Sequence, residues 1–236
     1  MTKQELFDYI AGQEEFLNKV SDSVWDNPET CYSEKISSEI ICKALEEQGF
    51  QVERDVADIP TAFTGTFGHG KPVIGFLGEF DALSGLSQVA GATEKIAVHP
   101  GGNGHGCGHN LLGTGCLAAA IGLKKYLEEN GKEGTIIFYG CPAEEGGGGK
   151  TFMAREGCFD HLDAAIAWHP GDAYGSSAGS TLANCQIISA IKESVLMLEF
   201  PHILDEVRSD AVTLFNVGSS VPQRACSSIL SGCIMQ

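Results

Sequence analysis

Helical and strand-like spacings of apolar residues alternate along this chain. Residues 6–20 have a helical spacing that slips once, and they predict an amphipathic first helix. Residues 33–49 carry an apolar stripe at every fourth position and predict a second helix that ends at Gly49. The apolar, small-residue-rich stretch 111–126 predicts a long buried helix, and residues 152–155 predict a short one.

Short apolar runs between these helices have the composition of β-strands. The runs are residues 50–56, 61–67, 73–77, 135–139 and 164–168. The last two are apolar throughout, which is typical of strands that are covered on both faces. The turn residues at 68–72 predict a hairpin between the second run and the third. Strands that alternate with helices indicate an α/β sheet.

Polar clusters follow three of these strands, and a fourth cluster precedes the long helix. The clusters are residues 78–81, 105–110, 144–145 and 169–170. In open α/β sheets, ligands bind in the crevice outside the carboxyl ends of the strands. We therefore expect the four clusters to meet at one crevice.

The side chains in these clusters are those that bind transition metals. Thiolate, imidazole and carboxylate are the donors that such ions use in proteins. Cys107 and His109 flank a glycine, which allows one tight loop to present both donors. Glu144 and Glu145 are adjacent, so one carboxylate can bind a metal while its neighbour faces the attacking water. A divalent ion acidifies water, and a nearby carboxylate can carry its proton, so the pattern indicates metal-assisted hydrolysis of a carbonyl compound.

Each cluster taken alone also has a purely structural interpretation. A single histidine after a strand, such as His169, is more often a satisfied core or surface residue, and an acidic pair is more often a solvated turn. Their matching positions at strand ends favour a shared site over four unrelated features. A metal-storage or redox-sensing protein is the weaker alternative, because it would give Glu144 and Glu145 no role.

Composition narrows the choice of partner. Among 236 residues, 31 acidic side chains stand against 15 basic ones, and a net charge of −16 disfavours nucleic acid and anionic membrane surfaces. No apolar run reaches the roughly 18–20 residues of a membrane span. Nine cysteines without a paired framework, together with an N-terminus that has no signal-peptide pattern, predict reduced thiols and a cytoplasmic protein.

Three motifs carry a resemblance to a known family. They are GHGCGHNLLGTG, PAEEGGGGK and the corner Trp168-His169-Pro170. The chain resembles the aminoacylase-type metallopeptidase and amidohydrolase superfamily, in the branch of aminobenzoyl-glutamate hydrolase, indole-acetyl-amino-acid hydrolases and β-alanyl dipeptidase-like relatives. The resemblance implies an α/β fold, with a three-layer zinc-peptidase-like catalytic domain and an inserted α/β lid domain. Asn110 stands where many members have Asp.

The resemblance also implies roles for individual residues. Cys107, His109, Glu145 and His169 would bind two divalent metal ions, zinc or manganese with cobalt as a further candidate. Glu144 would be the general base and then the general acid, and Asp81 would be the second catalytic residue, which orients the site. The implied substrate is a small amino-acid conjugate or dipeptide, split at an N-acyl or N-aryl amide, and full-length relatives would be homodimers through the lid.

The resemblance divides the chain into two parts. Residues 1–186 match the first segment of the catalytic domain, and 187–236 are expected to be an incomplete, divergent start of the lid. The stretch 189–209 can spell the lid sequence of relatives when it is read one base out of frame, so a frameshift is our hypothesis for it. A second catalytic segment with a further metal-binding histidine would be missing, which leaves an inactive fragment or pseudoenzyme as the alternative.

Overall fold

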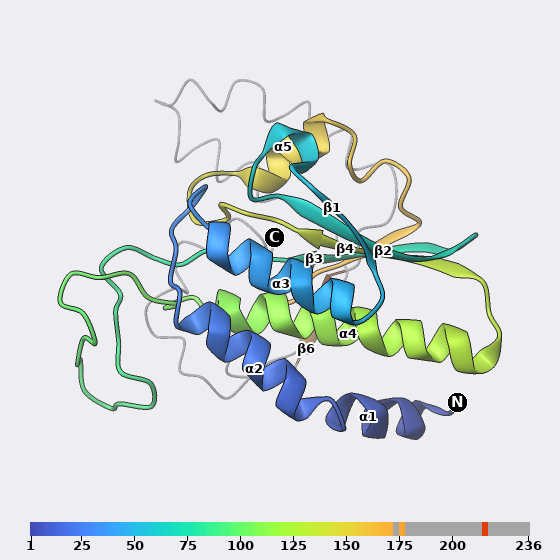
Figure 1. Cartoon of the computed structure of the whole chain (residues 1–236), viewed down its shortest axis with the longest axis horizontal. Helices are drawn as coiled ribbons and strands as arrows, with labels where there is room; N and C mark the ends of the chain where they lie inside the picture. The colour runs from blue at the N-terminus through green and yellow to red at the C-terminus, as the bar shows by residue number, and fades with distance from the viewer. Residues whose placement is uncertain (172–174, 178–213, 217–236) are drawn as a thin grey trace.

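A five-stranded mixed sheet lies at the centre of the structure (Figure 1). The computed structural model describes residues 1–171, 175–177 and 214–216. In spatial order the strands are β1 (Gln51–Arg54), β2 (Phe63–His69), β4 (Gly134–Gly140), β3 (Val73–Gly78) and β5 (Ala164–Ile166). β2 runs antiparallel to both of its neighbours, β1 and β4, whereas β3 runs parallel to both of its neighbours, β4 and β5.

Helices cover both faces of this sheet. They are α1 (Lys3–Ala11), α2 (Glu14–Trp25), α3 (Lys35–Glu47), α4 (His109–Asn130), α5 (Gly149–Arg155) and the 3₁₀ turn η1 (Val56–Asp58). Figure 1 shows α2, α3 and α4 on one side of the sheet and α5 on the other. These three layers confirm the predicted α/β class.

The central strand β4 shows why its sequence is apolar throughout. Ile136 and Phe138 lie in the larger core under α2–α4, and Ile137 and Tyr139 lie in the smaller core near α5. Successive side chains of a strand point to opposite faces, so a strand between two helix layers needs apolar residues at every position. The long helix α4 connects β3 to its parallel neighbour β4, as a crossover must.

The hairpin predicted at residues 68–72 is wrong. β2 pairs along its whole length with β4, from Phe63 opposite Gly140 to His69 opposite Gly134, so β4 lies between β2 and β3. Turn residues mark a change of direction, but they do not determine which strand becomes the neighbour. Here the apolar strand β4 takes the central place and separates the two strands that the turn connects.

The first helix is also divided, because residues 6–20 belong to both α1 and α2. The break is at Gly12, whose N–H donates to the carbonyl of Asp8 and ends α1. The slip in apolar spacing marks this break. The other predicted helices and the predicted strands are confirmed within a few residues at their ends.

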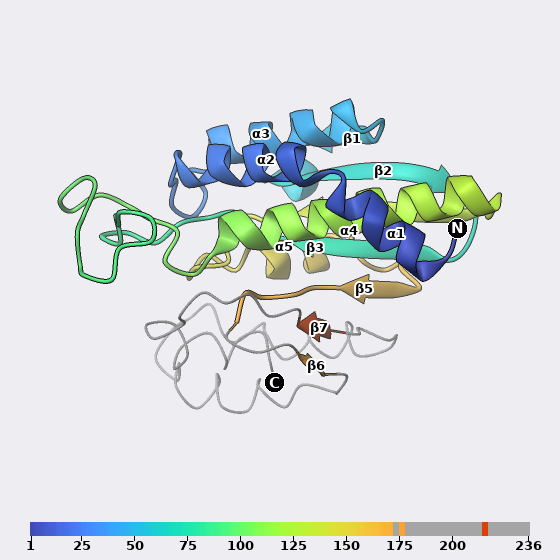
Figure 2. The same cartoon turned by 90° about the horizontal axis from the view of Figure 1, so that it is seen from below.

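A small second sheet pairs β6 (Gly175–Ser177) with β7 (Leu214–Asn216) in antiparallel fashion (Figure 2). Apart from 214–216, the predicted lid start at 187–236 and its frameshifted stretch lie outside the described residues, so the division at residue 186 stays a prediction. Among the helices that the structure describes, none has the length and apolar character that crossing a bilayer requires.

Candidate metal centre

The carboxyl ends of β3, β4 and β5 lie together at one edge of the sheet. Gly78, the last residue of β3, pairs with Gly140, the last residue of β4. The chain leaves these strands into residues 79–81, 141–145 and 167–170. Three of the four predicted polar clusters therefore start at the same edge, and the fourth arrives at the beginning of α4.

A glycine in left-handed conformation brings Cys107 and His109 to this edge. Gly108 has a φ of +75° and is the N-cap of α4, so His109 is the first residue of the helix. A residue with a Cβ is strained at such a φ, which is why the loop needs glycine here. Both donors are buried: Cys107 is 6% exposed and His109 is fully enclosed.

Asp81 fixes the ring of His109. Its Oδ1 accepts a hydrogen bond from Nδ1 of His109 at 2.9 Å, and its Oδ2 accepts one from the backbone N–H of Glu145 at 2.8 Å. Burial raises the pKa of Asp81, but the hydrogen bond and charge of His109 outweigh burial and hold it below its ordinary value. With Nδ1 committed in this way, only Nε2 of His109 is left to face the site.

The buried carboxylate of Glu34 anchors the turn that carries Glu144 and Glu145. Ala143 has a φ of +57°, which is unusual for a residue with a Cβ. Its N–H donates to Oε1 of Glu34 at 2.8 Å, and Oε2 of Glu34 accepts from Thr61 at 3.1 Å. Glu34 and Asp81 together anchor the backbone on both sides of the acidic pair.

Four buried polar atoms converge without a hydrogen-bond partner among the described residues: Nε2 of His109 and one carboxylate oxygen each of Glu79, Glu144 and Glu145. The three oxygens lie 3.2, 3.7 and 3.9 Å from that nitrogen. Buried polar atoms normally have partners, because leaving one unpaired costs about 1–3 kcal/mol. A group of unpaired atoms around one point therefore calls for a ligand that they share.

The pKa values at the site reflect this crowding of negative charge. Burial alone would lower the pKa of His109, but the Asp81 hydrogen bond and the charges of Glu79 and Glu144 raise it to about 9. Burial, and then the charge of Glu79, raise the pKa of Glu144 to about 7. Burial also raises the pKa of Glu145. A cation placed among these groups would relieve their mutual repulsion.

His169 reaches the site from the end of β5 and meets Cys107. Its Nε2 lies 3.1 Å from Sγ of Cys107, while its Nδ1 donates to the carbonyl of Pro170 at 2.8 Å. The preceding Trp168 donates to the Leu112 carbonyl on α4 at 3.0 Å, and it packs where Gly115 leaves space for the indole. This packing holds His169 with Nε2 toward the thiol, the tautomer that a metal-binding histidine requires.

The donor set fits a pair of divalent ions. Cys107, His109 and His169 form one group whose donor atoms all lie within 4.8 Å of one another, and Glu79, His109 and Glu144 form another. Thiolate and imidazole donors suit zinc and similar ions, and carboxylates suit harder ions as well. Glu145, which the sequence predicts as a ligand, is in neither group, although its unpaired oxygen lies 3.9 Å from Nε2 of His109. The residues present fit a pair of metal ions, and the assignment of individual ligands stays a prediction.

All six residues predicted from the sequence lie in this cluster, as the convergence of strand ends requires. Three further residues belong to the cluster or support it and were not predicted: Glu79, Glu34, and Lys150, whose Nζ donates to Oε1 of Glu79. Glu79 lies in the same polar cluster as Asp81, so its position at a strand end was a signal that could have been used. No local pattern marks Glu34, because its partner Ala143 is 109 residues away along the chain.

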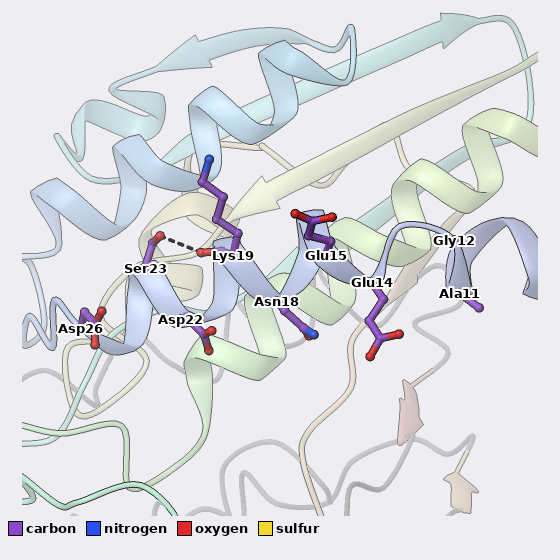
Figure 3. A pocket seen from close by; sticks show the side chains of 9 residues that line it. All are labelled: Ala11, Gly12, Glu14, Glu15, Asn18, Lys19, Asp22, Ser23 and Asp26. Atoms are coloured by element: carbon purple, nitrogen blue, oxygen red, sulfur yellow. Dashed lines mark hydrogen bonds between the residues drawn. The ribbon is translucent and has the colours of Figure 1, made fainter.

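A separate hollow runs along the exposed side of α2 (Figure 3). It has a volume of about 760 Å³ and is lined by residues between Ala11 and Asp26, with Ser23 donating to the Lys19 carbonyl. None of the donor residues lines it. Its carboxylates, including Glu14 and Glu15, project from one helix and are exposed, so it is not the candidate site.

Comparison with known proteins identifies relatives of this chain. The family model for peptidase family M20/M25/M40 matches residues 75–183. Among curated proteins, the chain is 51% identical to one of the subunits of p-aminobenzoyl-glutamate hydrolase from Escherichia coli, over 90% of its own length and 44% of that protein. It is 31% identical to the IAA-amino acid hydrolase ILR1-like 6 of Arabidopsis thaliana over 75% of its length and 38% of that protein.

Solved structures show the same fold. The YXEP protein of Bacillus subtilis, a dinuclear metal-binding peptidase from the M20 family, matches 76% of this chain and 56% of its own with a TM-score of 0.54 and 21% identity. The chain spans less than half the length of the two curated relatives from Escherichia coli and Arabidopsis thaliana.

Proposed function

This chain belongs to peptidase family M20/M25/M40, and on that basis we propose that it hydrolyses the amide of an N-acyl or N-aryl amino acid, or of a dipeptide-like molecule. Aminobenzoyl-glutamate is the first candidate substrate, because the relative at 51% identity is named for it. The observation that supports hydrolysis is the convergence of four unpaired buried atoms beside the pair formed by Cys107 and His169.

In the proposed site, Cys107, His109, Glu145 and His169 hold two divalent ions, with zinc, manganese and cobalt as the candidates. When bound there, such ions would supply Lewis acidity to the scissile carbonyl and to the attacking water. Asp81 keeps His109 in the tautomer that leaves Nε2 toward the ions. A cytoplasmic location is part of the proposal, and the free thiols among the described residues support it.

Glu144 moves the proton. One of its oxygens is buried without a partner and faces the site, so it can accept a proton from the attacking water as the new C–O bond forms. The same oxygen then gives the proton to the leaving nitrogen as the C–N bond breaks. The second proton of the water also passes to the amine, so the products are a carboxylate and a protonated amine. Glu144 and Glu145 lie almost equally far from His109, so the division of roles between them rests on the family resemblance.

The test uses the 236-residue chain loaded with zinc, manganese or cobalt. Hydrolysis of aminobenzoyl-glutamate and a panel of N-acyl amino acids is followed together with bound metal. We expect Glu144→Gln to keep its metal and lose about 10²–10⁴-fold in kcat. Glu145→Gln should lose metal instead.

The exposed pair Glu14 and Glu15 on α2 provides the matched control, because Glu15→Gln removes the same charge outside the site. It should change neither metal content nor rate. Metal without turnover in the parent chain would support the alternative, a metal-binding pseudoenzyme. If Glu144→Gln loses metal and Glu145→Gln keeps it, the two roles are reversed.

A further inference from the structure

An ion pair between a buried carboxylate and a partly exposed lysine borders the metal centre, and the proposed mechanism does not use it. Glu79 follows β3 directly and is 2% exposed. Its Oε1 accepts a hydrogen bond from Nζ of Lys150 at 2.5 Å. Lys150 lies in the first turn of α5, so the pair connects the end of the sheet to the helix on its far face.

The second oxygen of Glu79 points into the site. Within the part of the chain that the structure describes, Oε2 has no hydrogen-bond partner. It lies 3.2 Å from Nε2 of His109, closer to that nitrogen than the described carboxylate oxygens of Glu144 and Glu145. An ion pair that served only the fold would be expected to satisfy both oxygens, because an unpaired buried oxygen is costly. This oxygen is buried and unpaired beside other metal donors.

The geometry of His109 gives this oxygen a role. Nδ1 donates to Asp81, so His109 has one nitrogen to offer, and one lone pair binds one ion. Both donor groups of the site contain His109, and Nε2 is the nitrogen that it can offer to either. If the ion beside Cys107 and His169 takes it, the second ion depends on carboxylates.

We propose that Glu79 is a ligand of this second ion, and that Lys150 holds its carboxylate in place. The proposal rests on the two-metal function argued above. The charges at the site support the proposal. Four carboxylates and one thiolate carry five negative charges, and the Lys150 ammonium carries one positive charge. The resulting net charge of −4 balances two divalent ions; the five anionic groups are Glu79, Asp81, Cys107, Glu144 and Glu145. A carboxylate that bonds an ammonium through one oxygen keeps the other for a metal.

Cobalt titration of the chain tests this without any measurement of hydrolysis. The ion beside Cys107 produces a thiolate-to-cobalt charge-transfer absorption, whereas the second ion does not, so the two can be counted separately. We expect two ions in the parent chain. Glu79→Gln should retain the thiolate-bound ion and weaken the other by about 100-fold or more, beyond the usual effect of residues that only orient ligands.

The double variant Glu79→Gln/Lys150→Met separates a ligand from a charge-balancing partner. If Glu79 only neutralises Lys150, removing both restores the second ion, and the proposal is wrong. If Glu79 is a ligand, the double variant remains deficient while Lys150→Met alone binds two ions. The double variant also leaves no unpaired charge, so it remains informative should Glu79→Gln fail to fold.

Lys71→Met is the matched control, because Lys71 pairs with the exposed Asp163 at the other end of β3. It should bind two ions with unchanged affinity. Two ions of unchanged affinity in Glu79→Gln would overturn this inference and leave the proposed function intact. A parent chain that binds no cobalt would overturn both, and a parent chain that binds only the thiolate-bound ion would overturn the role of Glu79.

Discussion

Two lysine–carboxylate pairs lie at opposite ends of β3, and their environments differ. At the amino end, Lys71 donates to Asp163 at 2.7 Å, and the other oxygen of Asp163 accepts from the Val73 N–H at 2.7 Å. The side chain of Lys71 is 74% exposed to solvent and that of Asp163 is 36% exposed. At the carboxyl end, Glu79 is buried, pairs with Lys150 through one oxygen and leaves the other without a partner.

The same chemical pair therefore serves two purposes. The exposed pair connects a loop to a strand, satisfies its oxygens and is well solvated, so little stability depends on it. The buried pair keeps an oxygen unpaired at a cost in stability, and folds retain such groups mainly where a ligand will meet them. Exposure and completeness of hydrogen bonding, rather than residue type, distinguish the two ends.

Removal of His109 should disrupt the carboxyl end most. His109→Ala takes away the nitrogen that both donor groups share, so bound metal should fall close to zero. Without metal, the buried carboxylates of Asp81 and Glu79 lose their positive neighbour, which we expect to cost about 3–5 kcal/mol. Thermal unfolding should show a Tm that is lower by roughly 6–20 °C.

His161 lies outside the site and is exposed, so His161→Ala is the control for this change and should leave Tm and metal content unchanged. A His109→Ala protein that still holds two ions would show that the donors are other residues.

Lys150→Met tests the buried pair directly. In the metal-free protein it leaves the Glu79 carboxylate buried without its ammonium, which should cost about 1–3 kcal/mol. Because the proposed ion also meets Glu79, saturating zinc should recover most of this loss, and the rise in Tm on adding zinc should exceed that of the parent chain. If Lys150→Met loses the same amount of stability with and without zinc, Glu79 does not bind the ion.

Glu34 offers a comparison between a hydrogen bond and a charge. Glu34→Ala leaves the buried N–H of Ala143 without its acceptor, so we expect a loss of about 1–3 kcal/mol. The turn of the acidic pair loosens as well, and metal affinity should fall about 10-fold. Glu34→Gln keeps an oxygen for that N–H and should recover most of both, as isothermal titration and unfolding can measure. Equal effects of the two variants would mean that the charge matters, not the acceptor.

Lys71→Met should have the smallest effect. Its partner Asp163 is solvated and keeps the hydrogen bond from Val73, so Tm and metal affinity should stay within experimental error. A clear loss of stability here would show that the two ends of β3 are more alike than their exposure suggests.

Sequence reasoning predicted those parts of the fold that depend on local spacing. The strands, the helix that becomes α4 and the acidic pair after β4 follow from apolar periods and from the rule that strand ends meet. The order of strands did not follow, because the turn at 68–72 carries no information about β4, which pairs with β2 from more than sixty residues away along the chain.

The site divides in the same way. Cys107, His109 and His169 carry signals of their own in glycine spacing and residue type, and their convergence was predicted. The contributions of Glu34 and Lys150 depend on three-dimensional contacts with Ala143 and Glu79, and no local pattern encodes these. Supporting carboxylates are ordinary glutamates in the sequence, and only burial reveals their role.

The wide spacing of the metal donors along the chain has a consequence for how quickly the protein is degraded. Cys107 and His169 are 62 residues apart, and they lie on loops that leave different elements. An ion bound between them cross-links these loops, and ligands that bind only the folded state stabilise it by about 2.7 kcal/mol at a hundredfold excess over Kd. Resistance to proteolysis should therefore rise and fall with free metal, so that metal supply would control how long the protein persists as well as what it can do.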